Sequence, residues 1–147
     1  MNTDSVRPLI SVIIPTYNYA ATLPRAVASV AGQLDEQHEL IVIDDGSTDN
    51  TPEVIQALEA TGPRRTRFIR KENGGPSSVR NRGIAEAAGT YLIFLDADDE
   101  MAPEALAKIS RHLAQSPDTQ LVIGGHVSIT PDGKQKTHLP QKTLPET

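Results

Sequence analysis

Three aspartates follow the apolar segment "YLIFL" (Tyr91–Leu95): Asp96, Asp98 and Asp99. A short apolar run predicts a strand buried on both faces, and neighbouring carboxylates are costly to bury unpaired. A turn that caps a helix at Pro103, or a solvated acidic corner, would explain the cluster without a ligand. A site for a hard divalent cation would also explain it, because such cations prefer oxygen ligands. The other polar segments must decide between these interpretations.

Three further segments carry side chains that could bind a ligand: "PTYN" (Pro15–Asn18), "DDGSTD" (Asp44–Asp49) and "NGGPSS" (Asn73–Ser78). Tyr17 could stack on a flat ring or pack as an ordinary loop residue, and the adjacent aspartates could accept hydrogen bonds from a ligand. Glycines and serines just before a helix suit a phosphate. The chain has no P-loop pattern and no G-x-G-x-x-G after its first strand, which argues against P-loop and dinucleotide-binding domains.

The elements that must position these residues alternate between strands and helices. The hydrophobic pattern predicts strands over residues 9–14, 39–44, 66–70, 90–95 and 119–125, helices that begin at Thr22, Thr51, the Asn73–Ser78 loop and Pro103, and a hairpin around Asp132. This alternation predicts an α/β fold with a mostly parallel sheet and helices on both faces. In such sheets ligands bind beyond the carboxyl ends of the strands, where three of the polar segments fall. Their placement favours a ligand site over solvated turns.

Composition excludes several classes of function. The 147 residues suffice for one core, and the absence of cysteine excludes a disulfide framework, a thiol nucleophile and a thiolate zinc site. A net charge of −5 gives no general attraction to nucleic acid, and no apolar stretch is long enough for a membrane span. The polar start lacks the features of a signal peptide. We therefore expect a cytoplasmic protein, or one peripheral to the inner face of the membrane. We also expect His38 and His112 at the surface.

Four segments resemble the family 2 glycosyltransferases, which are inverting, nucleotide-sugar-dependent enzymes with a GT-A fold. They are "SVIIPTYN", "LIVIDDGSTDNT", "NGGPSSVRNRGI" and "GTYLIFLDADDEMAPEAL", in the family's order and at its intervals. The resemblance covers residues 11–125. It implies a nucleotide-sugar-binding domain over residues 1–125, with residues 126–147 forming a hairpin and tail at the start of an acceptor-side segment. It also implies a hexosyltransferase-type activity in the synthesis of cell-envelope polysaccharide.

The resemblance also implies roles for individual residues. Asp96-Ala97-Asp98 matches the D-x-D motif, so that Asp98 would ligate Mn²⁺ or Mg²⁺ and Asp96 would approach both the metal and the ribose. Asp99 would lie beside these ligands or cap the next helix. The implied nucleotide contacts are Pro15, Thr16 and Tyr17 at the base and ribose, Asp45 at the base, and Gly75 and Arg80 at the diphosphate. A UDP-sugar is the first candidate donor, although guanine and thymine donors remain open.

One part of the family pattern is missing. Inversion requires a general base that deprotonates the acceptor hydroxyl, and after the fifth predicted strand the only acids are Asp132, in a turn, and Glu146, at the terminus. We therefore expect a truncated nucleotide-binding part of a transferase with a glycan or lipid-linked acceptor. A non-catalytic module that binds a nucleotide sugar is the alternative.

Two unrelated classes of protein share parts of the pattern. Haloacid dehalogenase-type phosphotransferases also place D-x-D after a buried strand, but the residues that follow Asp98 and the late position of the motif differ from theirs. Response-regulator receivers have a comparable spacing between an acid pair such as Asp44–Asp45 and a later aspartate. However, a receiver begins with the strand that carries the pair and has a late Lys-Pro, which this chain lacks. Neither of these two classes fits the sequence as well as the family 2 glycosyltransferases do.

Overall fold

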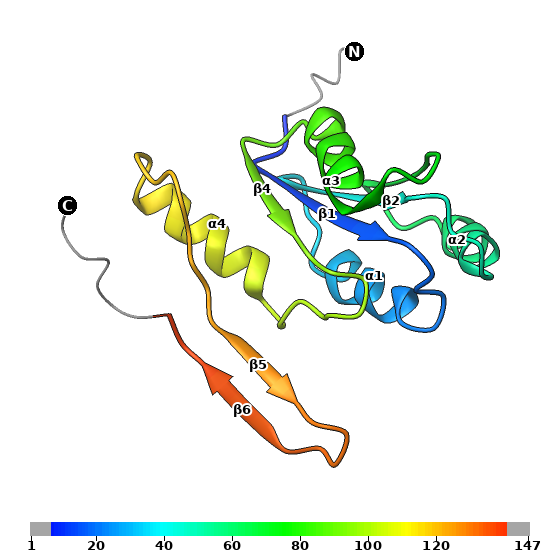
Figure 1. The fold of residues 1–147 in the computed structure, drawn as a ribbon. Coiled ribbons are helices and arrows are strands. Elements are labelled where there is room, and N and C mark those ends of the chain that lie inside the picture. The colour runs from blue at the N-terminus through cyan, green and yellow to red at the C-terminus, as the bar shows by residue number, and fades with distance from the viewer. Residues whose placement is uncertain (1–6, 141–147) are drawn as a thin grey trace. The chain divides into compact units, whose positions relative to one another are not determined.

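The computed structural model describes residues 7–140, in which strands and helices alternate (Figure 1). The elements are β1 (Ile10–Thr16), α1 (Leu23–Ala31), β2 (His38–Asp44), α2 (Thr51–Ala60), β3 (Thr66–Arg70), α3 (Gly75–Glu86), β4 (Tyr91–Phe94), α4 (Ala105–Gln115), β5 (His126–Ile129) and β6 (Gln135–His138). The first four strands form one parallel sheet in the order β3-β2-β1-β4. The predicted α/β class with a parallel sheet is confirmed.

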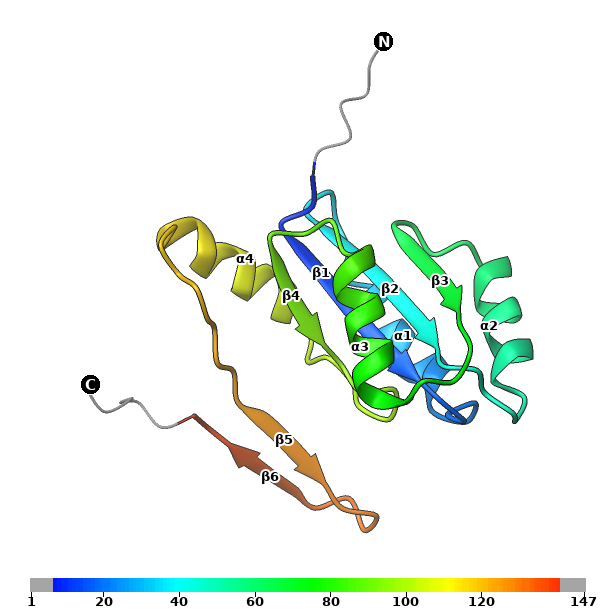
Figure 2. The same ribbon diagram turned by 45° about the horizontal axis from the view of Figure 1, so that its top comes forward.

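Helices cover both faces of this sheet. Figure 2 shows α3 crossing the near face, with α1 behind the sheet. On the α3 side the core comprises Ile13, Ile41, Ile43 and Val79. Gly83 of α3 lies so close to β1 that a Cβ there would approach Ile13 Cγ2 to 2.6 Å. The missing side chain at Gly83 therefore lets α3 lie directly against the two central strands.

Strand β1 ends at Thr16, two residues beyond the predicted end at Ile14. β1 pairs with β4 only from Ile10 to Ile13, whereas its pairing with β2 continues to Thr16. Asp45 N donates to Thr16 O at 2.9 Å, so the backbone of Thr16 faces β2 and that of Pro15 faces the side where β4 has ended. The N–H that proline lacks would have met no strand there, so the sheet tolerates Pro15.

Strand β4 is not buried on both faces, contrary to the prediction for "YLIFL". Leu92 and Phe94 are each 38% exposed, whereas Tyr91 and Ile93, which alternate with them, are more buried. β4 pairs with β1 alone, so it is an edge strand among the described residues. Alternating exposure is what an edge strand with one covered face should show. An apolar run alone did not distinguish this arrangement from a fully buried strand.

The predicted strand over residues 119–125 is wrong, because that segment joins neither of the two sheets. A strand requires a neighbour for its backbone groups, and the apolar residues alone do not supply one. The predicted hairpin is confirmed as the antiparallel pair β5–β6, with His126 opposite His138. The chain divides into two compact units, one ending at Arg111 and one beginning at His112. None of the helices described has the length and apolarity of a membrane span.

Two local predictions also need correction. His38 is buried, with 1% of its surface exposed, instead of lying at the surface. Its ring bridges two elements: Nε2 lies 2.8 Å from Ser110 Oγ, and Nδ1 lies 2.8 Å from Asp35 Oδ1. The last long helix begins at Ala105 instead of Pro103. The two residues before it form a turn, in which Glu104 has a left-handed backbone with φ of 60°.

Candidate functional site

One cavity of about 510 Å³ opens at the carboxyl ends of β1, β2 and β4. This volume lies within the usual range for small-molecule sites. The cavity is lined by Pro15, Thr16, Tyr17, Tyr19, Asp45, Asn73, Gly75, Pro76, Val79, Arg80, Asp96, Ala97 and Asp98. The eight residues to which the family resemblance gave nucleotide or metal contacts are all in this set. Segments that are far apart in the sequence therefore meet at one concave surface.

Asn18 fixes the loop that follows β1, which contributes residues to the cavity. Asn18 has φ of 61°, a left-handed conformation that asparagine tolerates better than most residues. Its side-chain Oδ1 accepts hydrogen bonds from the backbone N–H groups of Thr48 at 2.8 Å and Asp49 at 3.2 Å. The loop thus presents Tyr17 and Tyr19 to the cavity, each with 42% of its surface exposed. These rings offer flat apolar faces beside polar groups.

Asp45 lines the cavity and is buried, with 2% of its surface exposed. Its Oδ1 accepts from Lys71 Nζ at 2.7 Å and from Gly74 N at 3.0 Å, and its Oδ2 accepts from Gly75 N at 2.8 Å. Burial acts to raise the pKa of Asp45, but these hydrogen bonds outweigh it and lower the pKa below its usual value. Asp45 therefore stays ionised at neutral pH and fixes the start of α3.

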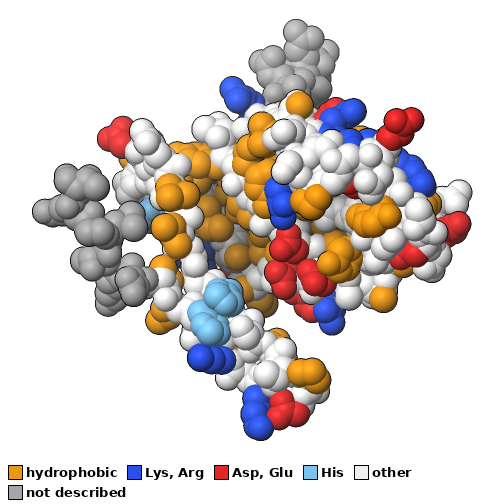
Figure 3. Space-filling model, in the orientation of Figure 1, with side chains coloured by type: hydrophobic (Ala, Val, Ile, Leu, Met, Phe, Trp, Pro, Cys, Tyr) orange, Lys and Arg blue, Asp and Glu red, His pale blue; other side chains and the backbone are white. Residues whose placement is uncertain are grey.

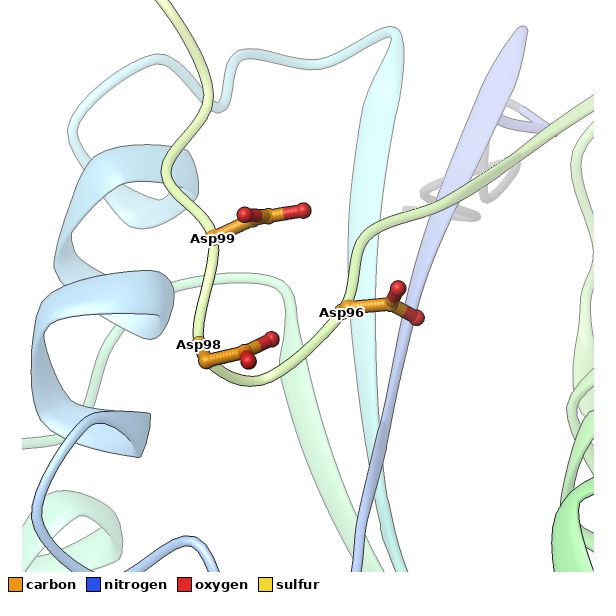
Figure 4. A group of neighbouring side chains, drawn as sticks. All are labelled: Asp96, Asp98 and Asp99. Atoms are coloured by element: carbon orange, nitrogen blue, oxygen red, sulfur yellow. The ribbon is translucent and has the colours of Figure 1, made fainter. Parts of the chain in front are cut away.

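The D-x-D segment follows β4 as a turn in which Asp99 N donates to Asp96 O at 3.0 Å. Carboxylate oxygens of Asp96, Asp98 and Asp99 lie within 4.8 Å of one another, and all three side chains are exposed. In Figure 4 the three side chains point in the same direction, those of Asp98 and Asp99 toward the part of the loop that carries Asp96. In Figure 3 acidic side chains gather over the end of β4. Arg80 Nη2 of α3 lies 3.4 Å from Asp96 Oδ1, so one cation already faces this group.

Asp44 and Asp45 have different surroundings although they are adjacent. Asp44 is fully buried, accepts a hydrogen bond from Ser47 N at 2.9 Å, and is not among the cavity-lining residues. Its role in the structure is to hold the turn after β2. From the sequence we expected both aspartates to accept hydrogen bonds from a ligand. In the structure only Asp45 lines the cavity.

Tyr19 and Lys71 lie at the cavity although they were not singled out from the sequence. Tyr19 lines it, and Lys71 forms an ion pair with Asp45. Lys71 directly follows β3, so the rule that ligands bind beyond strand ends pointed to it. Tyr19 lies three residues past the end of β1, in a loop whose conformation no periodicity reveals.

The candidate general bases do not fit that role within residues 7–140. Asp132 lies in the β5–β6 turn, where it is hydrogen-bonded to Thr130 and its carboxylate lies 2.8 Å from Lys134 Nζ. Hydrogen bonds from Lys134 and Thr130 lower the pKa of Asp132, which makes it a weaker base. Glu146 lies outside the described residues.

Comparison with known sequences assigns the chain to a family. The sequence model of glycosyl transferase family 2 matches residues 11–146. A glycosyltransferase of Nostoc sp. is 41% identical over 128 residues, which cover 87% of this chain and 39% of the relative. Chondroitin synthase of Pasteurella multocida is 36% identical over 126 residues, covering 86% of this chain and 13% of that enzyme. The chain thus spans less than half the length of these relatives.

Solved structures give the same assignment. One is TarS of S. aureus, residues 1–349 in complex with UDP-GlcNAc. The match covers 93% of this chain and 38% of the TarS chain, with a TM-score of 0.69 and 26% sequence identity. Another is a mannosyltransferase of Pyrobaculum calidifontis in complex with GDP-Man and Mn²⁺. The match covers 86% of this chain and 37% of the mannosyltransferase chain, with a TM-score of 0.67 and 26% sequence identity. The chain therefore belongs to glycosyl transferase family 2 and has the GT-A fold.

Proposed function

We propose that this chain binds the nucleoside diphosphate part of a sugar donor, a UDP-sugar first among the candidates, for metal-dependent glycosyl transfer with inversion. The observation that carries the proposal is the single cavity that collects all eight candidate contacts from the ends of three strands and the start of α3. The hexosyltransferase-type reaction and the glycan or lipid-linked acceptor, as in cell-envelope polysaccharide synthesis, belong to the same proposal.

The chemistry of the cavity suits a nucleotide. Tyr17 offers a ring face for a base, and stacking of this kind tolerates different bases. Thr16 Oγ1 is buried and has no hydrogen-bond partner among residues 7–140, although Thr16 lines the cavity. A buried hydroxyl without a partner is costly, so a ligand that pairs with it gains affinity. We propose that Asp45 accepts a hydrogen bond from the base through the free acceptor capacity of its carboxylate.

The acidic group suits a hard divalent cation. Asp96, Asp98 and Asp99 supply only carboxylate oxygens, which Mn²⁺ and Mg²⁺ prefer over softer ligands. Asp98 and Asp96 would hold the ion. A bound ion would neutralise the charge that develops on the leaving diphosphate. Arg80, which lies 3.4 Å from Asp96, would add a second positive charge beside the ion.

A non-catalytic nucleotide-sugar-binding module is the alternative, because Asp132 is unsuited to be the base and no other acid was a candidate within the described residues. On either reading we expect these 147 residues to bind a nucleotide more readily than they transfer a sugar. Slow hydrolysis of UDP-GlcNAc without an acceptor would favour the transferase, since it requires a working leaving-group site.

The decisive experiment is a calorimetric titration of UDP into the protein with and without Mn²⁺. We expect Mn²⁺ to strengthen binding at least tenfold and Asp98→Ala to abolish this gain. Asp118→Ala serves as the control, because Asp118 is exposed and does not line the cavity. Titrations with GDP and dTDP then identify the base. Absence of binding by all three nucleotides would overturn the proposal.

A further inference from the structure

The loop that follows the aspartates is tied to α1 by three side chains. Arg25 and Ser29 lie on α1, and Gln33 follows its end. Because they are spaced four residues apart, they lie along one face of α1 and its continuation. We refer to Arg25, Ser29 and Gln33 as the brace residues. Each of them has a contact outside the α1 segment, and these contacts fall on residues 100–106, directly after Asp99.

The first two contacts hold the beginning of this loop. Arg25 Nε lies 2.6 Å from Glu100 Oε1, in an exposed ion pair that contributes little by itself. Ser29 Oγ accepts a hydrogen bond from Met101 N at 2.9 Å. The same hydroxyl donates to Ala26 O at 2.7 Å, which fixes its direction. Because Met101 is two residues after Asp99, this bond restrains the backbone next to the metal-binding group.

Gln33 holds the other end of the loop through both atoms of its amide. Its Nε2 donates to Ala102 O at 2.9 Å, and its Oε1 accepts from Leu106 N at 3.2 Å. Leu106 N belongs to the first turn of α4, where backbone N–H groups lack partners within the helix. Between these two bonds lies Glu104 with its left-handed φ of 60°. Such a backbone persists only where the surroundings hold it.

We infer that the brace residues are positioning residues for the metal-binding aspartates. On its β4 side the Asp96–Asp99 turn is anchored by Leu95 N, which donates to Ile13 O at 3.0 Å. On its other side, among residues 7–140, the brace residues make the side-chain hydrogen bonds and the ion pair that tie residues 100–102 to α1 and the residue after it. Exposed carboxylates that repel one another converge on a cation only if their backbone is held. This inference rests on the proposed metal-dependent function.

Two observables test the inference without measuring turnover. In Gln33→Met the side chain keeps its size but loses its hydrogen bonds to Ala102 and Leu106, together with a bond from Nε2 to Ser29 O within the α1 segment. Amide exchange at Leu106 should become faster. The Mn²⁺ affinity, followed by paramagnetic broadening of the Asp98 amide, should weaken about threefold to tenfold, the loss expected for one or two hydrogen bonds. UDP binding without metal should change less than twofold. Gln56→Met is the matched control, because Gln56 is exposed on α2.

Ser29 supplies a second, milder test. Ser29→Ala should weaken the Mn²⁺ affinity in the same direction, and Ser29→Thr, which keeps the hydroxyl, should restore it. If Gln33→Met unfolds the protein, the Ser29 pair decides. Faster exchange at Leu106 or Met101 with an unchanged Mn²⁺ affinity would show that these side chains stabilise the loop without positioning the aspartates, and would overturn the inference.

The outcomes separate this inference from the proposed function. Mn²⁺ binding that weakens in Gln33→Met, in a protein that binds no nucleotide, would refute the nucleotide site and support the positioning role. Mn²⁺-dependent UDP binding that is identical in wild type, Gln33→Met and Ser29→Ala would support the nucleotide site and refute the positioning role. A wild-type protein that shows no Mn²⁺ effect at Asp98 would overturn both.

Discussion

The ammonium group of Lys71 lies 2.7 Å from the carboxylate of Asp45, and both groups are largely shielded from water. Lys71 directly follows β3, and Asp45 directly follows β2. The same carboxylate accepts the N–H groups of Gly74 and Gly75, so one acid joins two strand ends to the first turn of α3. Asp45 thus shapes the cavity as well as lining it.

Removal of the Lys71 charge should destabilise the protein in a pH-dependent way. Lys71→Met leaves a buried carboxylate without its ion partner, and we expect a loss of about 2 kcal/mol in the free energy of unfolding at pH 7. Folding lowers the pKa of Asp45, so its ionised form contributes stability above about pH 4 that is lost as the pH falls further. The cost of the substitution should therefore shrink at pH 3. Urea denaturation of wild type and Lys71→Met at pH 7 and pH 3 measures this difference in the free energy of unfolding.

Lys108→Met provides the control for that experiment. Lys108 and Glu104 form an exposed ion pair with 65% and 77% of their side-chain surfaces accessible. Such pairs contribute about 0–1 kcal/mol. An equal loss for the two lysines, or a loss for Lys71→Met that does not depend on pH, would contradict the buried ion pair.

Tyr17 should contribute to nucleotide affinity through its ring and not through its hydroxyl group. Tyr17→Ala removes the surface on which a base would stack, and we expect UDP binding to weaken about tenfold, since such stacking contributes about 1–3 kcal/mol. Tyr17→Phe should bind within about twofold of wild type. Calorimetry of the two variants gives the comparison. A large loss in Tyr17→Phe would instead indicate a hydrogen bond from the hydroxyl.

His38 should make stability fall under mildly acidic conditions. Burial lowers the pKa of His38, although the nearby Asp35 carboxylate acts in the opposite direction. The unfolded chain therefore takes up a proton near pH 6.5 that the folded protein resists, and stability is lost as the pH falls from about 7 towards 5.5. His38→Gln should flatten this dependence in urea denaturation, whereas His112→Gln, at an exposed position, should not.

Two glycine substitutions should have different effects on stability. At Gly83 a Cβ would meet Ile13 Cγ2, which cannot move freely because isoleucine is stiff at χ1. We expect Gly83→Ala to lower the free energy of unfolding by about 1–3 kcal/mol, despite the better helix propensity of alanine. At Gly32, φ is −68° and the nearest atom to a Cβ is 3.6 Å away. Gly32→Ala should be neutral or slightly stabilising. Thermal and urea unfolding of both variants provide the test.

The sequence predicted the sheet and the place of the cavity for a physical reason. Apolar strands that alternate with capped helices have few stable arrangements, and parallel strands bring their carboxyl ends to one edge. Hence Tyr17, Asp45 and Asp98, which come from three separate segments, could be expected at one surface from the order of strands and helices alone. The prediction depended on topology and not on knowledge of individual contacts.

The contacts themselves could not be predicted in this way. Nothing in the local sequence indicates that Lys71 pairs with Asp45, or that Gln33 reaches Leu106, because these partners meet only after the strands and helices have packed. His38 was misplaced for a related reason: a histidine at the start of a strand is buried only if another element covers it, as Ser110 of α4 does here. Residues 119–125 show the converse, since an apolar run without a neighbouring strand forms no strand.

The order of the strands has a consequence for how the protein folds. β1 pairs with β2 over a short separation in sequence, but its other neighbour is β4, so that Ile10 must find Tyr91 after three helices and two strands have intervened. Pairings between distant segments form slowly because the loop must close before the contacts stabilise it. The aspartates after β4 therefore join Tyr17 and Asp45 late in folding. Intermediates with β1, β2 and β3 in place would have much of their native helix and sheet but no complete cavity, so nucleotide binding would report only the fully assembled sheet.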